Sequence, residues 1–290
     1  MKILVTAASG FTGPHLVSHL SACGHEVTGI VREDVRLASA GCRLARADLS
    51  RELALDWRPD AIVHNAAHIG ADRRPAADFA VSNIQATRNV IDFALERGVE
   101  PLIFLSSLSA FGRITVPVVD ERTPVDSPAP YGLSKLYGEH MLREVEGKVR
   151  SLSLRLPGLL GPGCSGPWLA GVMARAREGR DIEIFNAAQP FNNAIHVEDL
   201  CRFIASVLNR TKAGADMVSL GTTDSLPLIE VVELIKARTA SRSNIVDRGP
   251  RDGAFSVSTA KAERDYGFSS MGIRETVCLY ADHATAKAAA

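Results

Sequence analysis

The sequence predicts an α/β protein built on a doubly wound parallel sheet, followed by a smaller C-terminal α/β domain. Apolar runs rich in Val and Ile alternate with helix-like segments through the first half of the chain. These runs are continuously apolar, as in strands that helices cover on both faces. Small or polar motifs follow the carboxyl ends of the runs, which is where such sheets bind ligands. This combination is typical of the Rossmann fold.

The predicted strands follow one another at regular intervals in the first half. In chain order they are KILVTA, EVTGIV, CRLARADL, DAIVHNAA and PLIFLSS, with helix-like segments near 15–22 and 79–97. The pattern weakens after SLSLRLPG, where GPGCSGPW is loop-like and LIEVVELIKARTA is an amphipathic helix. We therefore predict a first domain over 1–157, with sheet segments returning near 190–220, and a second over 158–189 and 221–290.

The composition narrows the function classes. The 33 basic and 33 acidic residues balance, so we expect neither nucleic acid nor an anionic membrane as partner. The apolar runs are far shorter than the ~20 residues that span a bilayer, and the N-terminus begins as a strand instead of a signal sequence. No Cys or His cluster has metal-ligand spacing, so we expect no metal. A cytoplasmic protein with reduced thiols is indicated, because the chain has five scattered cysteines: Cys23, Cys42, Cys164, Cys201 and Cys278.

The opening stretch MKILVTAASGFTG leads from a strand into a turn of small residues. Ala7, Gly10 and Gly13 form a glycine-type fingerprint whose first position carries a methyl group. Such a turn lets the backbone reach a pyrophosphate on the positive end of the next helix. We expect these residues, with Phe11 and Thr12 between them, to bind a dinucleotide; a turn that serves packing alone is the alternative. The first domain is then the dinucleotide-binding domain and the second the substrate domain.

The end of the second strand bears on the choice of dinucleotide. An acid there would bind a ribose 2′-hydroxyl and favour NAD, whereas Arg32 suits the 2′-phosphate of NADP. Glu33 and Asp34 follow directly, and a shift of one residue would return the preference to NAD. We expect NADP or NAD, with a slight preference for NADP. A merely solvated Arg32 is the alternative.

Ser107, Tyr131 and Lys135 form the strongest catalytic signal. Tyr131 and Lys135 are four residues apart in YGLSK, so a helix places them on one face. A nearby ammonium favours the phenolate of a tyrosine whose reference pKa of ~10 makes it a poor base at neutral pH. Ser107 ends a strand and could hydrogen-bond the substrate oxygen whose proton Tyr131 would move. The set predicts hydride transfer with Tyr131 moving the hydroxyl proton.

The chain resembles the extended short-chain dehydrogenases/reductases of the NAD-dependent epimerase/dehydratase family. The similar stretches run nearly end to end: VTAASGFTG, RADLS, HNAA, SNIQATRNVIDFA, FLSSLSAFG, DERTPVDSPAPYGLSK, LRLPGLLGPG, NNAIHVEDL and FSVSTAKAERDYGF. The resemblance implies a nucleotide-activated sugar as substrate and a homodimer formed through helices near 82–96 and 131–145. It also implies that Lys135 bonds the nicotinamide ribose, and it adds cofactor contacts from Asp48, Leu49, Ala66, Ala67 and Pro157.

Departures from the family pattern narrow the reaction. Family dehydratases carry an Asp-Glu pair where this chain has Leu108 and Ser109, and some epimerases carry a cysteine at the second position. What remains is an epimerase or, as the alternative, an NADPH-dependent ketoreductase on a keto sugar or smaller carbonyl compound. A non-catalytic dinucleotide-binding sensor is the third possibility, which the presence of the complete Ser-Tyr-Lys set disfavours.

The expected substrate site also departs from the family. An asparagine common in nucleotide-sugar enzymes is replaced by Gly158, and an arginine that binds phosphate is missing near Asn193. We expect Ser109, Gly158 and Asn193 to contact the substrate. Three arginines on one predicted helix could compensate, although a solvated helix face is the simpler interpretation: Arg175, Arg177 and Arg180. We expect a structural hydrogen-bonding role for His196 and no metal-binding role for His64 or His68.

Overall fold

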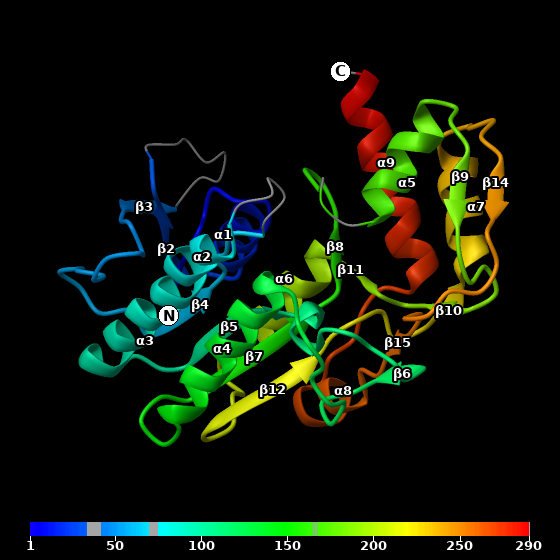
Figure 1. The fold of residues 1–290 in the computed structure, drawn as a ribbon. Coiled ribbons are helices and arrows are strands. Elements are labelled where there is room, and N and C mark those ends of the chain that lie inside the picture. The colour runs from blue at the N-terminus through cyan, green and yellow to red at the C-terminus, as the bar shows by residue number, and fades with distance from the viewer. Residues whose placement is uncertain (34–41, 70–74, 165, 167, 290) are drawn as a thin grey trace. The chain divides into compact units, whose positions relative to one another are not determined.

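The computed structural model describes residues 1–33, 42–69, 75–164, 166 and 168–289. The chain divides into two compact units, each considered by itself below (Figure 1). Unit 1 comprises Met1–Gly112, Val125–Arg155 and Cys201–Val218. Unit 2 comprises Arg113–Pro124, Leu156–Leu200 and Ser219–Ala290.

Unit 1 is organised around the predicted parallel sheet. Its seven strands lie in the order β12-β7-β5-β4-β1-β2-β3. Their bounds are β1 (Lys2–Val5), β2 (Glu26–Val31), β3 (Arg43–Arg46), β4 (Ala61–His64), β5 (Leu102–Ser107), β7 (Ser151–Leu156) and β12 (Ala215–Ser219). The first strand pairs in parallel with both β2 and β4. The strand order therefore reverses beside β1, and such a switch point is where open α/β sheets bind ligands. The predicted fold class is confirmed.

The helices of unit 1 cover this sheet with apolar faces. They are α1 (Thr12–Ala22), α2 (Ala76–Phe79), α3 (Ala86–Arg97), α4 (Pro130–Glu144) and most of α6 (Val197–Val207), with a π-helical turn η1 (Ala80–Gln85) and a 3₁₀ turn η2 (Leu108–Phe111). In α3 the buried positions recur at helical spacing, as in Val90, Ile91 and Ala94. They pack on strand residues such as Ile62 and Phe104, which are fully buried. Figure 1 shows α3 and α4 lying side by side against the sheet.

The described residues of unit 2 form short strand pairs and helices. The parallel pairs are β6 (Val118–Val119) with β15 (Ser256–Val257), β8 (Gly158–Leu160) with β11 (Ala194–His196), and β9 (Ile182–Ile184) with β14 (Ile245–Asp247). An antiparallel pair joins β10 (Pro190–Phe191) and β13 (Leu226–Pro227). The helices are α5 (Trp168–Arg177), α7 (Leu228–Arg238), α8 (Ala260–Tyr266) and α9 (Ile273–Ala289). A separate apolar core includes Leu169, Ile182, Val231 and Val277.

The two units differ from the predicted domains at three places. Residues 113–124 belong to unit 2, because β6 within them pairs with β15. The segment Val125–Arg155 of unit 1 ends two residues before the predicted boundary at Pro157. The returning segment of unit 1 is Cys201–Val218, so residues 190–200 and 219–220 of the predicted return lie in unit 2. The pairing of β6 with β15 joins residues far apart in the chain, which local periodicity does not reveal.

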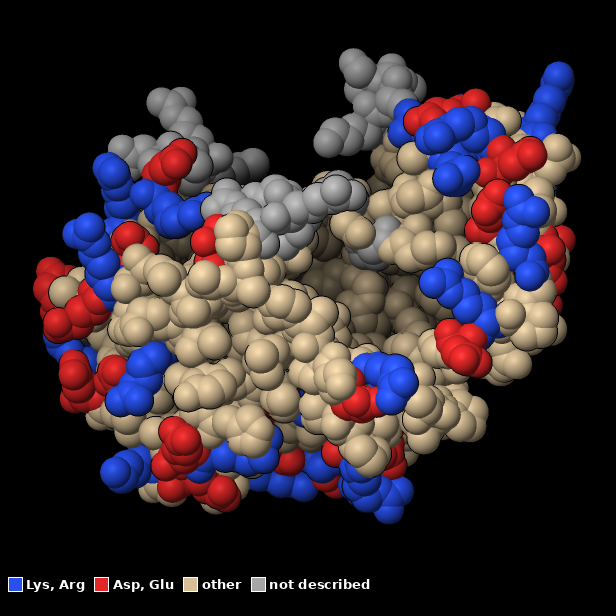
Figure 2. Space-filling model, in the orientation of Figure 1, with Lys and Arg blue, Asp and Glu red and all other residues tan. Residues whose placement is uncertain are grey.

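No described helix is both long enough and apolar enough to cross a membrane. Figure 2 shows basic and acidic side chains interspersed on the visible faces of both units. This mixture agrees with the balanced charge of the sequence.

Candidate functional site

The two glycines of the turn between β1 and α1 have different roles. A Cβ at Gly13 would lie 2.4 Å from the carbonyl oxygen of Ala7, so close packing of the turn requires glycine there. A Cβ at Gly10 would touch the same oxygen at 3.4 Å, an ordinary contact. The fold therefore does not require glycine at position 10, and its bare backbone leaves room for a ligand. Ala7 has a φ of 49°, in the left-handed region that favours glycine.

The start of α1 leaves its positive end available. The helix begins after Phe11, which makes no side-chain capping bond, and the first turn contains no acidic residue. Uncompensated N–H groups at a helix start attract anions. Phe11 contacts His15 edge to face, with ring centroids 5.8 Å apart, while Thr12 is buried.

The end of β4 is tied to the same turn. The hydroxyl of Thr6 accepts the backbone N–H groups of Asn65 and Ala66, each at 3.0 Å. The amide of Asn65 donates to the carbonyl of Ala7 at 3.3 Å. Ala66, and after it Ala67, thus lie where two parallel strands end side by side. The structure brings these predicted cofactor residues to the switch point.

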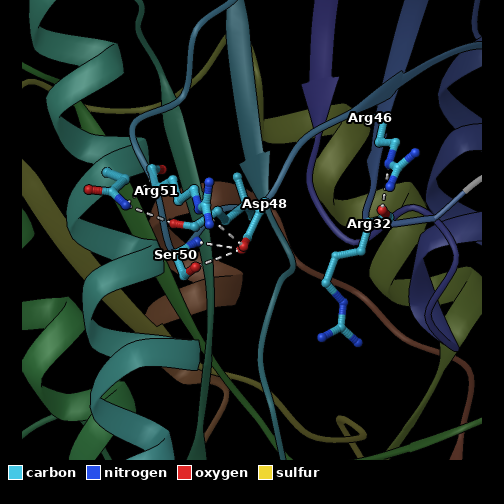
Figure 3. A network of polar contacts seen from close by, with 7 residues as sticks. Arg32, Arg46, Asp48, Ser50 and Arg51 are labelled. Atoms are coloured by element: carbon cyan, nitrogen blue, oxygen red, sulfur yellow. Dashed lines mark hydrogen bonds and ion pairs between the residues drawn. The ribbon is translucent and has the colours of Figure 1, made fainter.

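The predicted adenosine end of the site is shown in Figure 3. Arg46 donates from Nε to the carbonyl of Arg32 at 3.2 Å, and the Arg32 guanidinium extends away from this bond. Asp48 accepts the hydroxyl of Ser50 at 2.8 Å and its N–H at 3.0 Å. These bonds, that of the hydroxyl first, lower the pKa of the Asp48 carboxyl. Leu49 is buried, and Asp34, the alternative acid, lies outside the described residues.

Ser107, Tyr131 and Lys135 come together at the end of β5 and the start of α4. Tyr131 follows Pro130, the first residue of α4 and a favourable one there, and Lys135 lies one turn further on. Burial raises the pKa of the Tyr131 phenol, and the nearby Ser107 side chain partly opposes this rise. Ser109, which donates its N–H to the Ser107 hydroxyl at 3.1 Å, lies next to the set.

Lys135 is buried in a mixed environment. Its ammonium donates to the carbonyl of Leu105 at 2.7 Å and lies 4.8 Å from the centroid of the Phe104 ring. Burial lowers the pKa of Lys135 to about 7, while the charge of Glu139 acts to raise it. An amine that titrates near neutrality can modulate the proton affinity of a neighbouring phenol.

His64 and His68 serve structural contacts. The fully buried ring of His64 lies between two hydroxyls, with Nδ1 2.9 Å from Thr6 and Nε2 3.0 Å from Thr87. Burial, with the nearby Lys135 charge, lowers the pKa of His64 to about 3, so the ring is neutral. Among the described residues, no group of three or more His, Cys, Asp or Glu side chains is arranged to hold a metal ion.

Sequence reasoning missed a clamp on the catalytic helix. Asn83, buried in η1, accepts the N–H of His68 at 2.7 Å and donates to the carbonyl of His68 at 3.0 Å. Its amide also donates to the hydroxyl of Ser134 at 2.9 Å, which donates to the carbonyl of Tyr131 at 2.7 Å. One indication of this role is present in the sequence, because Asn83 is a polar residue on the apolar face of SNIQATRNVIDFA. The structure places Asn83 within a π-helical turn. Glu139 and Arg155 were also missed, although Glu139 follows Lys135 by one helical turn.

Unit 2 contains a cavity of about 530 Å³ that includes two predicted substrate residues, Gly158 and Asn193. Aromatic side chains line it, and the centroids of Trp168 and Phe191 lie 6.1 Å apart. Asn193 donates to the carbonyl of Phe255 at 3.0 Å, while its Oδ1 is buried without a hydrogen-bond partner among the described residues.

The cavity also contains a cation that sequence reasoning missed. The Arg251 guanidinium lies 4.9 Å from the centroid of the Phe185 ring. Asn186 holds the backbone of Arg251, accepting its N–H at 2.8 Å and donating to its carbonyl at 2.7 Å. None of the three arginines near α5 lines this cavity: Arg175, Arg177 and Arg180. Arg175 and Arg177 instead donate to carbonyls of unit 2, and Arg180 pairs with Glu178.

The two remaining predicted residues lie in unit 2. Pro157 precedes β8 and is half-buried. His196 is fully buried at the end of β11, where its Nδ1 accepts the N–H of Glu198 at 3.4 Å and its ring stacks on His283 with centroids 6.1 Å apart. These contacts give His196 a structural environment.

The fold and the Ser-Tyr-Lys set define a dinucleotide-dependent enzyme of the extended short-chain dehydrogenase/reductase type. The NAD dependent epimerase/dehydratase family model matches residues 3–221, and the chain belongs to this family. It is 27% identical to a dTDP-glucose 4,6-dehydratase of Actinoplanes sp., covering 97% of this chain and 98% of that one. It is 30% identical to a dTDP-4-dehydro-6-deoxy-D-allose reductase of Streptomyces sp., covering 75% and 77%. The solved structure of MoeE5 in complex with UDP-glucuronic acid and NAD has a TM-score of 0.83 at 23% identity, covering 99% of this chain and 100% of that one.

Proposed function

We propose that the protein catalyses NAD(P)-dependent oxidoreduction at one carbon of a nucleotide-activated sugar, as an epimerase. The observation that carries this proposal is the set of Ser107, Tyr131 and Lys135, in which the Ser107 side chain lies near enough to Tyr131 to lower the pKa of its phenol and Lys135 is buried. A binding protein without catalysis would not need these three groups together at the end of β5 and the start of α4. A non-catalytic sensor is therefore the weaker candidate.

The residues at the switch point fit a dinucleotide. Gly10 and the start of α1 would take its pyrophosphate, Asp48 and Leu49 its adenine end, and Ala66 and Ala67 the remaining length. When bound, the nicotinamide supplies an acceptor and donor for hydride. Tyr131 then removes and returns the proton of the substrate hydroxyl, Ser107 bonds that oxygen, and Lys135 favours the phenolate.

Dehydration is disfavoured by the residues after Ser107. Leu108 is buried and Ser109 is exposed, and neither side chain carries a carboxyl group that could eliminate water. The similarity to a dehydratase from Actinoplanes sp. therefore supports the family and the type of substrate, and not the elimination step.

The alternative is an NADPH-dependent ketoreductase, which would deliver its hydride once. Two observations favour it: the 30% identity to a reductase and the position of Arg32 at the end of β2. We propose a slight preference for NADP, because the Arg32 guanidinium would bind a 2′-phosphate. Replacing Arg32 by Ala is expected to weaken NADPH binding more than NADH binding. An equal loss for both would contradict this role of Arg32.

We assign the nucleotide part of the substrate to the cavity of unit 2. Its aromatic lining suits a nucleobase, the Oδ1 of Asn193 can accept a base N–H, and Arg251 can bind a phosphate. The carboxylates of Glu183 and Asp252 also line it, so the cavity is less positive than a site with several cations.

We also propose a homodimer in the cytoplasm. Three apolar side chains on η1 and α4 are about half exposed: Val81, Leu133 and Tyr137. These two elements are in contact, so the side chains can form one surface that a second copy would cover. Sedimentation of the purified protein tests the dimer, and Leu133→Lys should shift it to monomer. The five cysteines are free thiols, in keeping with a reducing compartment.

The experiment that tests the reaction is to denature freshly purified protein and identify any released dinucleotide. Bound NAD would favour an epimerase, which returns its hydride in each cycle, and would contradict the preference for NADP. An empty protein that binds NADPH more tightly than NADH would favour the reductase. A protein that binds neither would refute the proposed function.

A further inference from the structure

Unit 1 buries a pair of oppositely charged side chains close to Tyr131 and Lys135 of α4. Glu139 lies on α4 one turn after Lys135, and Arg155 lies on β7; their exposed fractions are 2% and 3%. Arg155 donates from Nε to one carboxylate oxygen of Glu139 at 2.9 Å and from Nη2 to the other at 2.7 Å. Such a bidentate pair fixes its two partners in position and orientation.

The same pair contacts the segments on either side of Ser107. The hydroxyl of Ser106 donates to Glu139 at 2.6 Å, and the Arg155 guanidinium lies 4.2 Å from the centroid of the Phe111 ring in η2. Glu139 is therefore held by groups from β5 and β7, and it has little freedom to move relative to Lys135.

The helix that carries Glu139, α4, is tightly packed against its neighbours. A Cβ at Gly132 would lie 2.0 Å from the carbonyl oxygen of Ser109, and one at Gly138 would lie 2.6 Å from the Phe104 ring. Backbone and ring are thus in direct contact along α4. The distance between the carboxylate of Glu139 and the ammonium of Lys135 is set by this packing and not by a flexible surface.

The charges around Lys135 have distinct effects. Two of the neighbouring groups lie on α4, namely the neutral phenol of Tyr131 and the carboxylate of Glu139. His64 belongs to β4 and Arg155 to β7. His64 is neutral because its pKa is about 3. Arg155 and Glu139 form an ion pair, in which Glu139 is the partner that lies one helical turn from Lys135. Burial disfavours the ammonium of Lys135, whereas the carboxylate of Glu139 favours it.

Stability alone does not account for a buried pair of this kind. Removing two charges from water costs so much that apolar side chains of similar size often serve a fold equally well or better. A second role is therefore expected, and the nearest group that depends on charge is Lys135.

We propose that Glu139 is a positioning residue: locked in place by Arg155 and Ser106, it favours the positively charged form of the Lys135 side chain one turn from Tyr131. This inference rests on the proposed function, since the charge of Lys135 matters only if Tyr131 exchanges a proton. A neutral Lys135 would withdraw the support for the Tyr131 phenolate.

The test is an NMR titration of protein labelled with ¹³C at the lysine Cε, in which Lys135→Met identifies the Lys135 signal. In Glu139→Gln the midpoint of Lys135 should fall by about one pH unit, the scale on which a neighbouring charge acts. The matched control is Ser106→Ala, which removes one hydrogen bond to Glu139 but leaves its charge and its two bonds to Arg155 in place. Its Lys135 midpoint should stay at that of the parent.

A second variant covers the case in which Glu139→Gln does not fold with Arg155 left unpaired. Glu139→Gln with Arg155→Gln removes both charges and retains polar side chains of similar length, and its Lys135 midpoint should also lie below that of the parent. An unchanged midpoint in the folded variant, even with a lower melting temperature, would make Glu139 purely structural and overturn the proposal. Binding of NADH and NADPH to the parent is measured separately, so failure of the proposed function is recognised by itself.

Discussion

The two units use charged side chains in different ways. In unit 1, Lys135, Glu139 and Arg155 are at most 3% exposed, and each has a partner fixed by the sheet or by α4. In unit 2, Arg251 lines an open cavity, stacked on Phe185 and attached through its backbone to Asn186. The first arrangement holds catalytic groups in one geometry, while the second leaves a cation available to a ligand. Substitution of the buried catalytic groups of unit 1 should therefore change rates, and substitution of Arg251 in unit 2 should change affinity.

The largest effect expected in this comparison is that of Tyr131→Phe. The change removes the hydroxyl that moves the proton, so turnover should fall by at least the ~10²–10⁴-fold typical of general acid–base catalysis. Dinucleotide affinity, measured by fluorescence, should stay near that of the parent. Retained turnover would reject Tyr131 as the catalytic acid and base.

Gly13→Ala and Gly10→Ala separate packing from binding within unit 1. At position 13 the new Cβ would meet backbone atoms, the Ala7 oxygen at 2.4 Å, so urea unfolding should show a loss of about 1–3 kcal/mol. At position 10 the contact of 3.4 Å is ordinary, so stability should change by less than about 0.5 kcal/mol. Dinucleotide affinity should nevertheless fall in Gly10→Ala. Equal losses of stability would contradict the separation.

Arg251→Met tests the cavity of unit 2. Loss of the guanidinium should weaken binding of UDP or dTDP about tenfold in calorimetry, which corresponds to roughly 1.4 kcal/mol. Arg238→Met is the matched control, because Arg238 pairs with Asp282 at 2.8 Å and neither residue lines the cavity. If both variants bound these nucleotides as the parent does, the nucleotide would have to be placed elsewhere.

The smallest effect concerns the methyl group at the first position of the turn. Ala7 has a φ of 49°, which glycine adopts without strain, so Ala7→Gly should stabilise the fold by about 0.5–1 kcal/mol after the greater freedom of glycine in the unfolded chain is deducted. Ala8→Gly is the control and should destabilise it, since Ala8 is fully buried against Gly29. Urea unfolding of both variants tests this.

The sequence by itself determined the parallel sheet, the turn after β1 and the pairing of Tyr131 with Lys135. Each depends on a local pattern, namely continuous apolar runs, a strand followed by small residues, and a spacing of four on a helix. The orientation of these groups is set once the first half of the chain folds, because the carboxyl ends of parallel strands lie at one edge of a sheet.

Only the tertiary structure decided which partners these groups meet. The bond of Glu139 to Arg155 depends on the packing of α4 beside β7, and the contact of Arg251 with Phe185 joins segments far apart in the chain. The clamp of Asn83 on Ser134 likewise needs η1 and α4 in contact. Periodicity shows which face of an element is buried, but a buried charge becomes stable only beside a specific partner, and long-range packing selects that partner.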